Sequence, residues 1–247
     1  MGDADQISER LTKRIIAIAD PQVRVRYLRH QLSQMRPGPI ADLITVALHR
    51  TEARDGDAGA LLLALCLALA HERSHGIRDA VVHSALDQGQ LETAAFLQPR
   101  PPDRLADGPT TIPDFGKGRQ VSLGERKSLA RTHDRDLLAR VIRDPHPDVI
   151  RILMGNPILT EKDVVRLCAQ RPVTPEVLRE VFSSARWIVR YGVRKAIVKN
   201  PFTPVDIALQ LSAHLTEPDA RAVVDSPELS VLVRDACRRV AGMQTLH

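Results

Sequence analysis

The sequence predicts an all-α protein in which a helical N-terminal domain is followed by a domain of helical repeats. The stretch Val149–Pro157 returns as Val193–Pro201 after 44 positions, and a spacing of about 40 to 47 residues is typical of paired-helix repeats. Aromatic residues make up 3% of the chain, while Leu, Ala, Val, Ile and Arg dominate, which suits packed helices better than sheets. With 43% hydrophobic and 26% charged residues, the composition is that of a folded protein.

The first 98 residues predict a close succession of helices. Ile7, Leu11 and Ile15 recur at a spacing of four, which places them on one face of a helix. The stretch Ala58–His71 is apolar on all sides, as expected of a central buried helix. The expected helices cover about Ile7–Ile18, Val25–Leu32, Ile40–Thr51, Ala58–His71, Ile77–Asp87 and Leu91–Leu97.

A change in composition then predicts a domain boundary. Residues 98–120 contain five prolines and three glycines, which exclude a helix and indicate a linker or a surface loop strapped to the protein. We therefore expect a helical N-terminal domain at 1–98, a Pro/Gly-rich linker at 99–121 and a repeat domain at 122–247.

Helix starts and stops are marked throughout the C-terminal half, where we expect about eight or nine short helices over 122–242. Ser122 and Glu125 fit a capping box, in which each side chain satisfies a free amide of the helix start. Shorter versions of this pattern, and a Thr-Pro start, occur at Thr160–Asp163, Thr174–Pro175, Thr203–Asp206 and Thr216–Asp219. The Asn-Pro pairs at 156–157 and 200–201 end the preceding helices, because the residue before proline is steered out of the helical conformation.

The Asn-Pro, Thr-x-x-Asp and Arg-x-x-Val pattern of residues 122–242 resembles bacterial HEAT-like or leucine-rich-repeat-variant α-helical repeat proteins. The resemblance covers about half of the chain, and its motifs mark the ends of helices. It implies a HEAT-like α-solenoid that binds a partner through its surface, and it confers no catalytic residue.

Cysteine usage and the N-terminal residues predict a cytoplasmic protein. Cys66, Cys168 and Cys237 are scattered through apolar helical stretches, which is typical of small core residues in a reducing compartment. The first residues show no signal peptide. The longest apolar run, Ala58–Ala70, has about 13 residues, fewer than the roughly 20 that a transmembrane helix needs.

Basic residues are concentrated in the repeat half, and they suggest a binding surface. The net charge is +5 overall, but residues 1–116 have a balance of −2 and residues 117–247 a balance of +7. We expect one helix over Arg186–Lys199 with two apolar faces and basic ridges between them that meet phosphates or acidic side chains. The candidate binding residues are Arg186, Trp187, Arg190, Tyr191, Arg194, Lys195 and Lys199.

Two of these features have a purely structural alternative. Trp187 and Tyr191 can stack on a base, but a lone tryptophan in a small domain more often anchors the core. The basic character of the repeat half is also explained as the solvated outer face of an arginine-rich repeat protein.

The sequence His71-Glu-Arg-Ser-His75 matches H-E-x-x-H, a pattern that on a helix holds zinc between two histidines beside a glutamate base, Glu72. Arg73 and Gly76 argue against such a site, since the glycine is typical of a helix C-terminus. The alternative is that two polar residues end a buried apolar helix. We therefore predict no catalytic residue, no metal ligand and no cofactor.

These observations favour a non-enzymatic interaction module or adaptor that presents a basic helical-repeat surface to an acidic protein partner. The alternative is a nucleic-acid-binding protein that uses the same surface. A zinc hydrolase at His71, Glu72 and His75 ranks third. No feature of the sequence specifies an oligomeric state.

Overall fold

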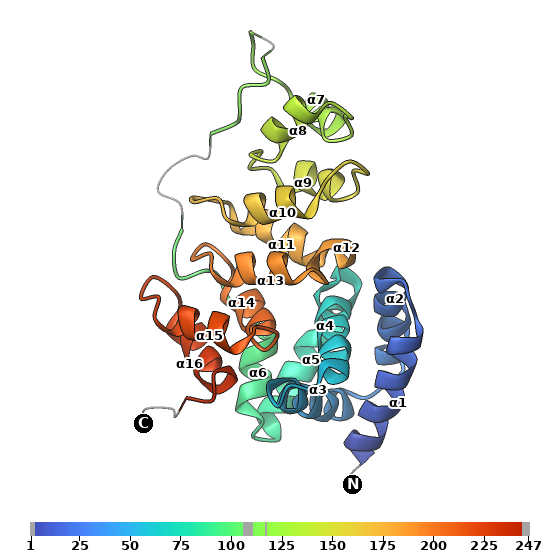
Figure 1. The fold of residues 1–247 in the computed structure, drawn as a ribbon. Helices are drawn as coiled ribbons and strands as arrows, with labels where there is room; N and C mark the ends of the chain where they lie inside the picture. The colour runs from blue at the N-terminus through green and yellow to red at the C-terminus, as the bar shows by residue number, and fades with distance from the viewer. Residues whose placement is uncertain (1–2, 106–110, 117, 244–247) are drawn as a thin grey trace.

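The structure is a computed structural model that describes residues 3–105, 111–116 and 118–243. Within these ranges the chain forms sixteen α-helices and one short 3-10 helix, with no β-strand (Figure 1). The predicted all-α class is therefore confirmed. None of the helices described is both long enough and apolar enough to cross a bilayer.

Six helices make up the N-terminal half: α1 (Asp3–Ala17), α2 (Pro21–Leu32), α3 (Pro37–Glu52), α4 (Gly56–Ala70), α5 (His75–Asp87) and α6 (Leu91–Leu97). Helix α4 is the centre of this half and packs against α1, α2, α3 and α5. This position explains its composition, because a helix covered on all sides has no polar face. Asp20 and Asp55 cap α2 and α4 by accepting hydrogen bonds from amides of the first turn.

The described parts of the predicted linker 99–121 lie against the C-terminal half. The backbone N–H of Arg100 donates to the carboxylate of Asp206 at 3.3 Å, and Phe115 is buried. Arg140 donates to the backbone oxygen of Asp114 at 3.0 Å. The described parts of this segment thus contact α14 and α8, and α7 begins at the far end of the molecule from α6 (Figure 1). Residues 106–110 and 117 of the predicted linker lie outside the described ranges.

Ten short helices follow, which is more than the eight or nine expected: α7 (Leu123–Leu129), α8 (Arg135–Val141), α9 (Pro147–Met154), α10 (Glu161–Cys168), α11 (Pro175–Ser183), α12 (Ala185–Ile188), α13 (Tyr191–Val198), α14 (Val205–Ser212), α15 (Glu217–Val224) and α16 (Val231–Val240). They succeed one another in chain order from α7 and α8 at the top of the molecule to α15 and α16 beside α6 (Figure 1).

The predicted capping boxes form at two helix starts and are absent at two others. Ser122 with Glu125 and Thr160 with Asp163 form reciprocal capping boxes at α7 and α10. The hydroxyl of Thr203 instead donates to a backbone oxygen of α13, so it does not cap α14. This difference arises because the carboxylate expected to complete that box is used by a tertiary ion pair with Arg179. Thr216 precedes α15 but accepts no hydrogen bond from its first amides, and Thr174 likewise precedes Pro175 of α11 without a side-chain cap.

Both copies of the recurring stretch contribute to the core. Val149 and Leu153 of α9, and Val193 and Ile197 of α13, are fully buried. Helix α9 packs between α7 and α11, whereas α13 packs between α10 and α14. The intervening α12 has a single turn and packs against α2. The two copies are thus alike in burial and differ in their neighbours.

The two halves pack on each other, and their buried apolar side chains form one continuous cluster. Helices α2, α4 and α6 contact α12, α11 and α14. Arg54 lies at the turn between α3 and α4 with a positive φ of 70°. Its guanidinium donates to the backbone oxygens of Leu215 and Val240 at 2.6 and 2.5 Å, so it joins the two halves directly.

Candidate functional site

The helix expected over Arg186–Lys199 is interrupted, which corrects the prediction. Helix α12 ends at Ile188, the backbone of Arg190 is extended, and α13 starts at Tyr191. In a continuous helix the carbonyls of Ile188 and Val189 would accept from backbone amides four residues later. Here they accept from Nη1 of Arg194, at 3.2 and 2.9 Å. The side chain of Arg194 therefore satisfies the end of α12 and stabilises the break.

Trp187 is a core anchor and offers no surface for stacking a base. Its side chain is 5% exposed, and its Nε1–H donates to the backbone oxygen of Met154 at 2.8 Å. The guanidinium of Arg186 lies 4.5 Å from the centre of the indole ring and donates to the oxygen of Asn156. The structural alternative for Trp187 is thus the one that the packing favours.

Three more of the candidate residues converge on one carboxylate, that of Asp219. Lys195 Nζ lies 2.8 Å from Oδ1, and Lys199 Nζ lies 3.7 Å from it. The Tyr191 hydroxyl donates to Oδ2 at 2.5 Å. Burial raises the pKa of Asp219, but the hydrogen bonds from Lys195 and Tyr191 outweigh it, so the pKa lies below its ordinary value. Much of the expected basic ridge is therefore neutralised within the protein.

Arg186 and Arg190 are the candidate cations that remain exposed. Among the described residues, the Arg190 side chain has no hydrogen bond or ion pair. Helix α10, which packs against α13, adds Lys162 and Arg166, two exposed cations that also lack a partner among the residues described. We refer to Lys162, Arg166, Arg186 and Arg190 as the basic surface.

The H-E-x-x-H match does not lie on a continuous helix. His71 has extended backbone after the end of α4, residues 72–74 form a 3-10 turn, and His75 begins α5. Gly76 therefore lies in the first turn of a helix, where the sequence suggested a helix end. The Nδ1 of His71 accepts a hydrogen bond from the backbone N–H of Arg73. In the described part of the chain, we find no group of three or more His, Cys, Asp or Glu side chains arranged to hold a metal ion.

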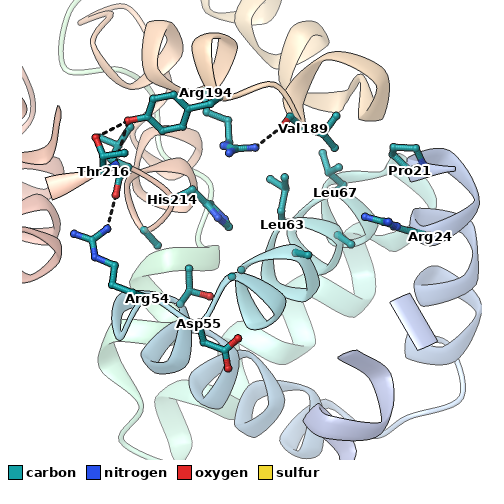
Figure 2. Close-up of a pocket in the computed structure, with 18 of the residues that line it drawn as sticks. Pro21, Arg24, Arg54, Asp55, Leu63, Leu67, Val189, Arg194, His214 and Thr216 are labelled. Atoms are coloured by element: carbon teal, nitrogen blue, oxygen red, sulfur yellow. Dashed lines mark hydrogen bonds between the residues drawn. The ribbon is translucent and has the colours of Figure 1, made fainter. Parts of the chain in front are cut away.

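A cavity of about 450 Å³ lies between the two halves (Figure 2). Helix α4 lines one side of it, together with the start of α2. The opposite side consists of the α12–α13 turn and the segment after α14. Along α4, the lining residues Gly56, Ala60, Leu63, Ala64 and Leu67 recur at spacings of three and four, so they share one face of the helix.

Arg194 and His214 are two of the polar side chains that line this cavity (Figure 2). The Nε of Arg194 is buried without a partner, and its Nη2 makes no hydrogen bond to any residue described. The Nε2 of His214 is likewise buried without a partner. Burial, and then the charge of Arg194, lower the pKa of His214 to about 3, so the imidazole is neutral at physiological pH.

The cavity has more cationic than anionic lining groups. Arg24, Arg54 and Arg194 all line it, and Asp55 is its one acidic residue among those described. Asp55 caps α4 and forms an ion pair with Arg50 at 2.6 Å. Arg50 itself does not line the cavity. Arg24 and Arg54 donate to backbone oxygens. Arg194 is consequently a charged group with no carboxylate among the residues described around it.

Sequence reasoning identified Arg194 but not the cavity. His214 lies 20 residues further along the chain, and the α4 face lies more than 120 residues earlier, so no local spacing connects them. The one sequence feature related to the cavity was the apolar character of residues 58–70. Burial in the core of the N-terminal half is enough to explain that character, so it did not indicate a cavity. Comparison of the chain with protein-family models, with curated proteins and with solved structures finds no match in any of the three.

Proposed function

We propose that this protein is a non-enzymatic interaction module that binds an acidic protein partner through its basic surface. The observation that carries the proposal is the exposed set Lys162, Arg166, Arg186 and Arg190, which lacks carboxylate partners among the described residues. Elsewhere in the same half, most cations are paired, as in Arg126 with Asp144 at 2.7 Å. Unpaired surface arginines favour acidic groups because their planar fork matches a carboxylate.

A HEAT-like α-solenoid for residues 122–247 is part of the same proposal. Short helices that succeed one another in chain order, with a recurring Asn-Pro helix end, support it. Such proteins bind by surface, and an adaptor role follows from that mode of binding. Residues 244–247 of the proposed domain lie outside the described ranges.

The test is a charge reversal with a matched control. The variant Arg186→Glu/Arg190→Glu alters the basic surface, while Arg10→Glu/Arg14→Glu makes the same change of charge on exposed positions of α1. Partners from the source cell are captured on the immobilised protein at low and high salt. We expect one acidic protein to be retained by the wild type and by the control, and to be lost by the surface variant. The difference in retention between the wild type and the surface variant should be smaller at high salt.

Two other results would overturn the proposal. Equal loss in both variants means that binding follows net charge, and equal retention places the binding site elsewhere.

Nucleic-acid binding through the same surface is the second candidate, and fluorescence anisotropy with a random-sequence DNA duplex tests it. That candidate requires an affinity that falls steeply with salt, and a smaller salt slope for Arg186→Glu/Arg190→Glu than for the wild type.

A further inference from the structure

The cavity between the two halves has the elongated, aliphatic floor that an extended hydrocarbon chain requires. Gly56 and Leu67 at its ends are eleven residues apart on α4, which corresponds to about 16 Å at 1.5 Å per residue. Between them the lining side chains of α4 are alanine and leucine, and Val25 and Val189 add aliphatic surface from α2 and the α12–α13 turn. A volume of about 450 Å³ is within the range of small-molecule sites.

Arg194 stands against this apolar floor without an ionic partner among the residues described. Arg194 uses Nη1 for two backbone oxygens, while Nη2 and Nε remain without hydrogen bonds to the residues described. Buried charges in proteins are normally paired, because an isolated ion in an apolar environment is strongly unfavourable. An anion in the cavity would supply the missing partner and would accept hydrogen bonds that are strengthened by both charges.

We infer that the cavity binds a small aliphatic carboxylate, with its carboxylate on Arg194 and its hydrocarbon chain along the Ala60, Leu63 and Leu67 face of α4. Neutral His214 also lines the cavity, and its Nδ1 lies 3.6 Å from the position that a Cβ at Gly59 of α4 would occupy. Tyr191 is the only Phe, Tyr or Trp among the described lining residues, and its hydroxyl is held by Asp219 and Thr216. An aliphatic body therefore fits this lining better than an aromatic one.

A monoanion with a hydrocarbon body is favoured over phosphate by the aliphatic face of α4, which phosphate would leave uncovered. Both Nη groups of Arg54 are occupied by backbone oxygens, whereas Arg24 uses only its Nε in this way. Of the two arginines with free donors, Arg194 is the one whose Nε is buried without a partner. We therefore place the carboxylate on Arg194.

Calorimetric titration of the full chain with octanoate tests the inference. We expect saturable binding at one site, with octan-1-ol and acetate each at least about tenfold weaker, since one lacks the charge and the other the chain. Inorganic phosphate is expected not to compete. Octanol binding as tightly as octanoate, or competition by phosphate at equal concentration, would overturn the assignment of a carboxylate.

Two cavity variants and a control locate the site. Ala60→Phe fills the cavity from α4 and is expected to abolish binding, while Ala95→Phe fills a separate groove between α6 and α16 and leaves it unchanged. Arg194→Lys keeps the positive charge but removes the planar guanidinium that can bind a carboxylate through two hydrogen bonds. We expect its affinity for octanoate to fall about tenfold. Unchanged octanoate affinity in Ala60→Phe contradicts the site.

The wild type alone provides a measurement that does not depend on the variants folding. In the bound state, nuclear Overhauser effects are expected between octanoate methylene protons and the methyl groups of Leu63 and Leu67, which line the cavity. Saturable binding without these contacts, or the absence of saturable binding to the folded wild type, would show that the cavity is not the site.

Discussion

Asn156 and Asn200 make the same set of hydrogen bonds at the ends of two different helices, and they are the only asparagines in the chain. Each Nδ2 donates to two backbone oxygens at the end of an earlier helix, those of Ala130 and Thr132 for Asn156 and of Cys168 and Gln170 for Asn200, at 2.7 to 3.0 Å. Each Oδ1 accepts from the backbone N–H two residues further on, at 3.0 Å. The recurring Asn-Pro pair therefore joins one helix end to another.

Replacing either asparagine with alanine is expected to lower the free energy of unfolding by about 2 to 3 kcal/mol, because buried backbone groups lose their partners. Both side chains are almost fully buried, at 3% and 2% exposure. Ser226 precedes a proline in the same way after α15, but its hydroxyl bonds only to its own helix. Ser226→Ala is therefore the control, with a cost within about 0.5 kcal/mol in urea unfolding. Similar costs for all three variants would contradict the role of the amides.

Arg190 and Arg194 are expected to respond differently to the same substitution. Arg190→Glu changes an exposed side chain and should cost within about 0.5 kcal/mol. Arg194→Glu removes the two hydrogen bonds that satisfy the end of α12 and places a carboxylate near backbone oxygens, at a cost of about 2 kcal/mol or more. Thermal and urea unfolding of both variants measure the difference. If Arg194→Glu is as stable as Arg190→Glu, the break between α12 and α13 does not depend on this guanidinium.

The ion pairs of Asp219 predict a pH-dependent contribution to stability. Its pKa is lower in the folded state than its ordinary value of 3.8, so the ionised carboxylate stabilises the fold above that value. Asp219→Asn is expected to cost about 1 kcal/mol at pH 7, as for a partly exposed ion pair. The difference in unfolding free energy between wild type and variant should shrink as the pH falls below 3.8 towards the folded pKa. A difference that stays constant over this range would show that Lys195 and Tyr191 do not hold the carboxylate.

Zinc binding at the H-E-x-x-H match is expected to be absent. His71 and His75 flank a 3-10 turn, so they lack the one-turn helical spacing that places two ligands on one face. Metal analysis of the protein purified without an affinity tag should find well under one zinc per chain. Stoichiometric zinc that is lost in His75→Ala would make this segment a metal site.

The sequence by itself determined the helices and many of their ends. Leu91–Leu97 begins and ends at the predicted residues, and the capping box at Ser122 and Glu125 is present as expected. These features depend on residues within about four positions of one another, through apolar periodicity and side-chain bonds to the first helical amides. Such local rules can be read from a single chain.

Only the tertiary structure decided which charges are free and where the cavity lies. Lys195 and Lys199 appear as a basic ridge in the sequence, but Asp219, some twenty residues away, neutralises them. Arg194 turns from the expected solvent-facing row towards the cavity, because the end of α12 requires a donor there. The cavity itself needs α4 and the segment around His214 to meet. These contacts join distant residues, and neither helical periodicity nor capping signals encode which distant segments will pack together.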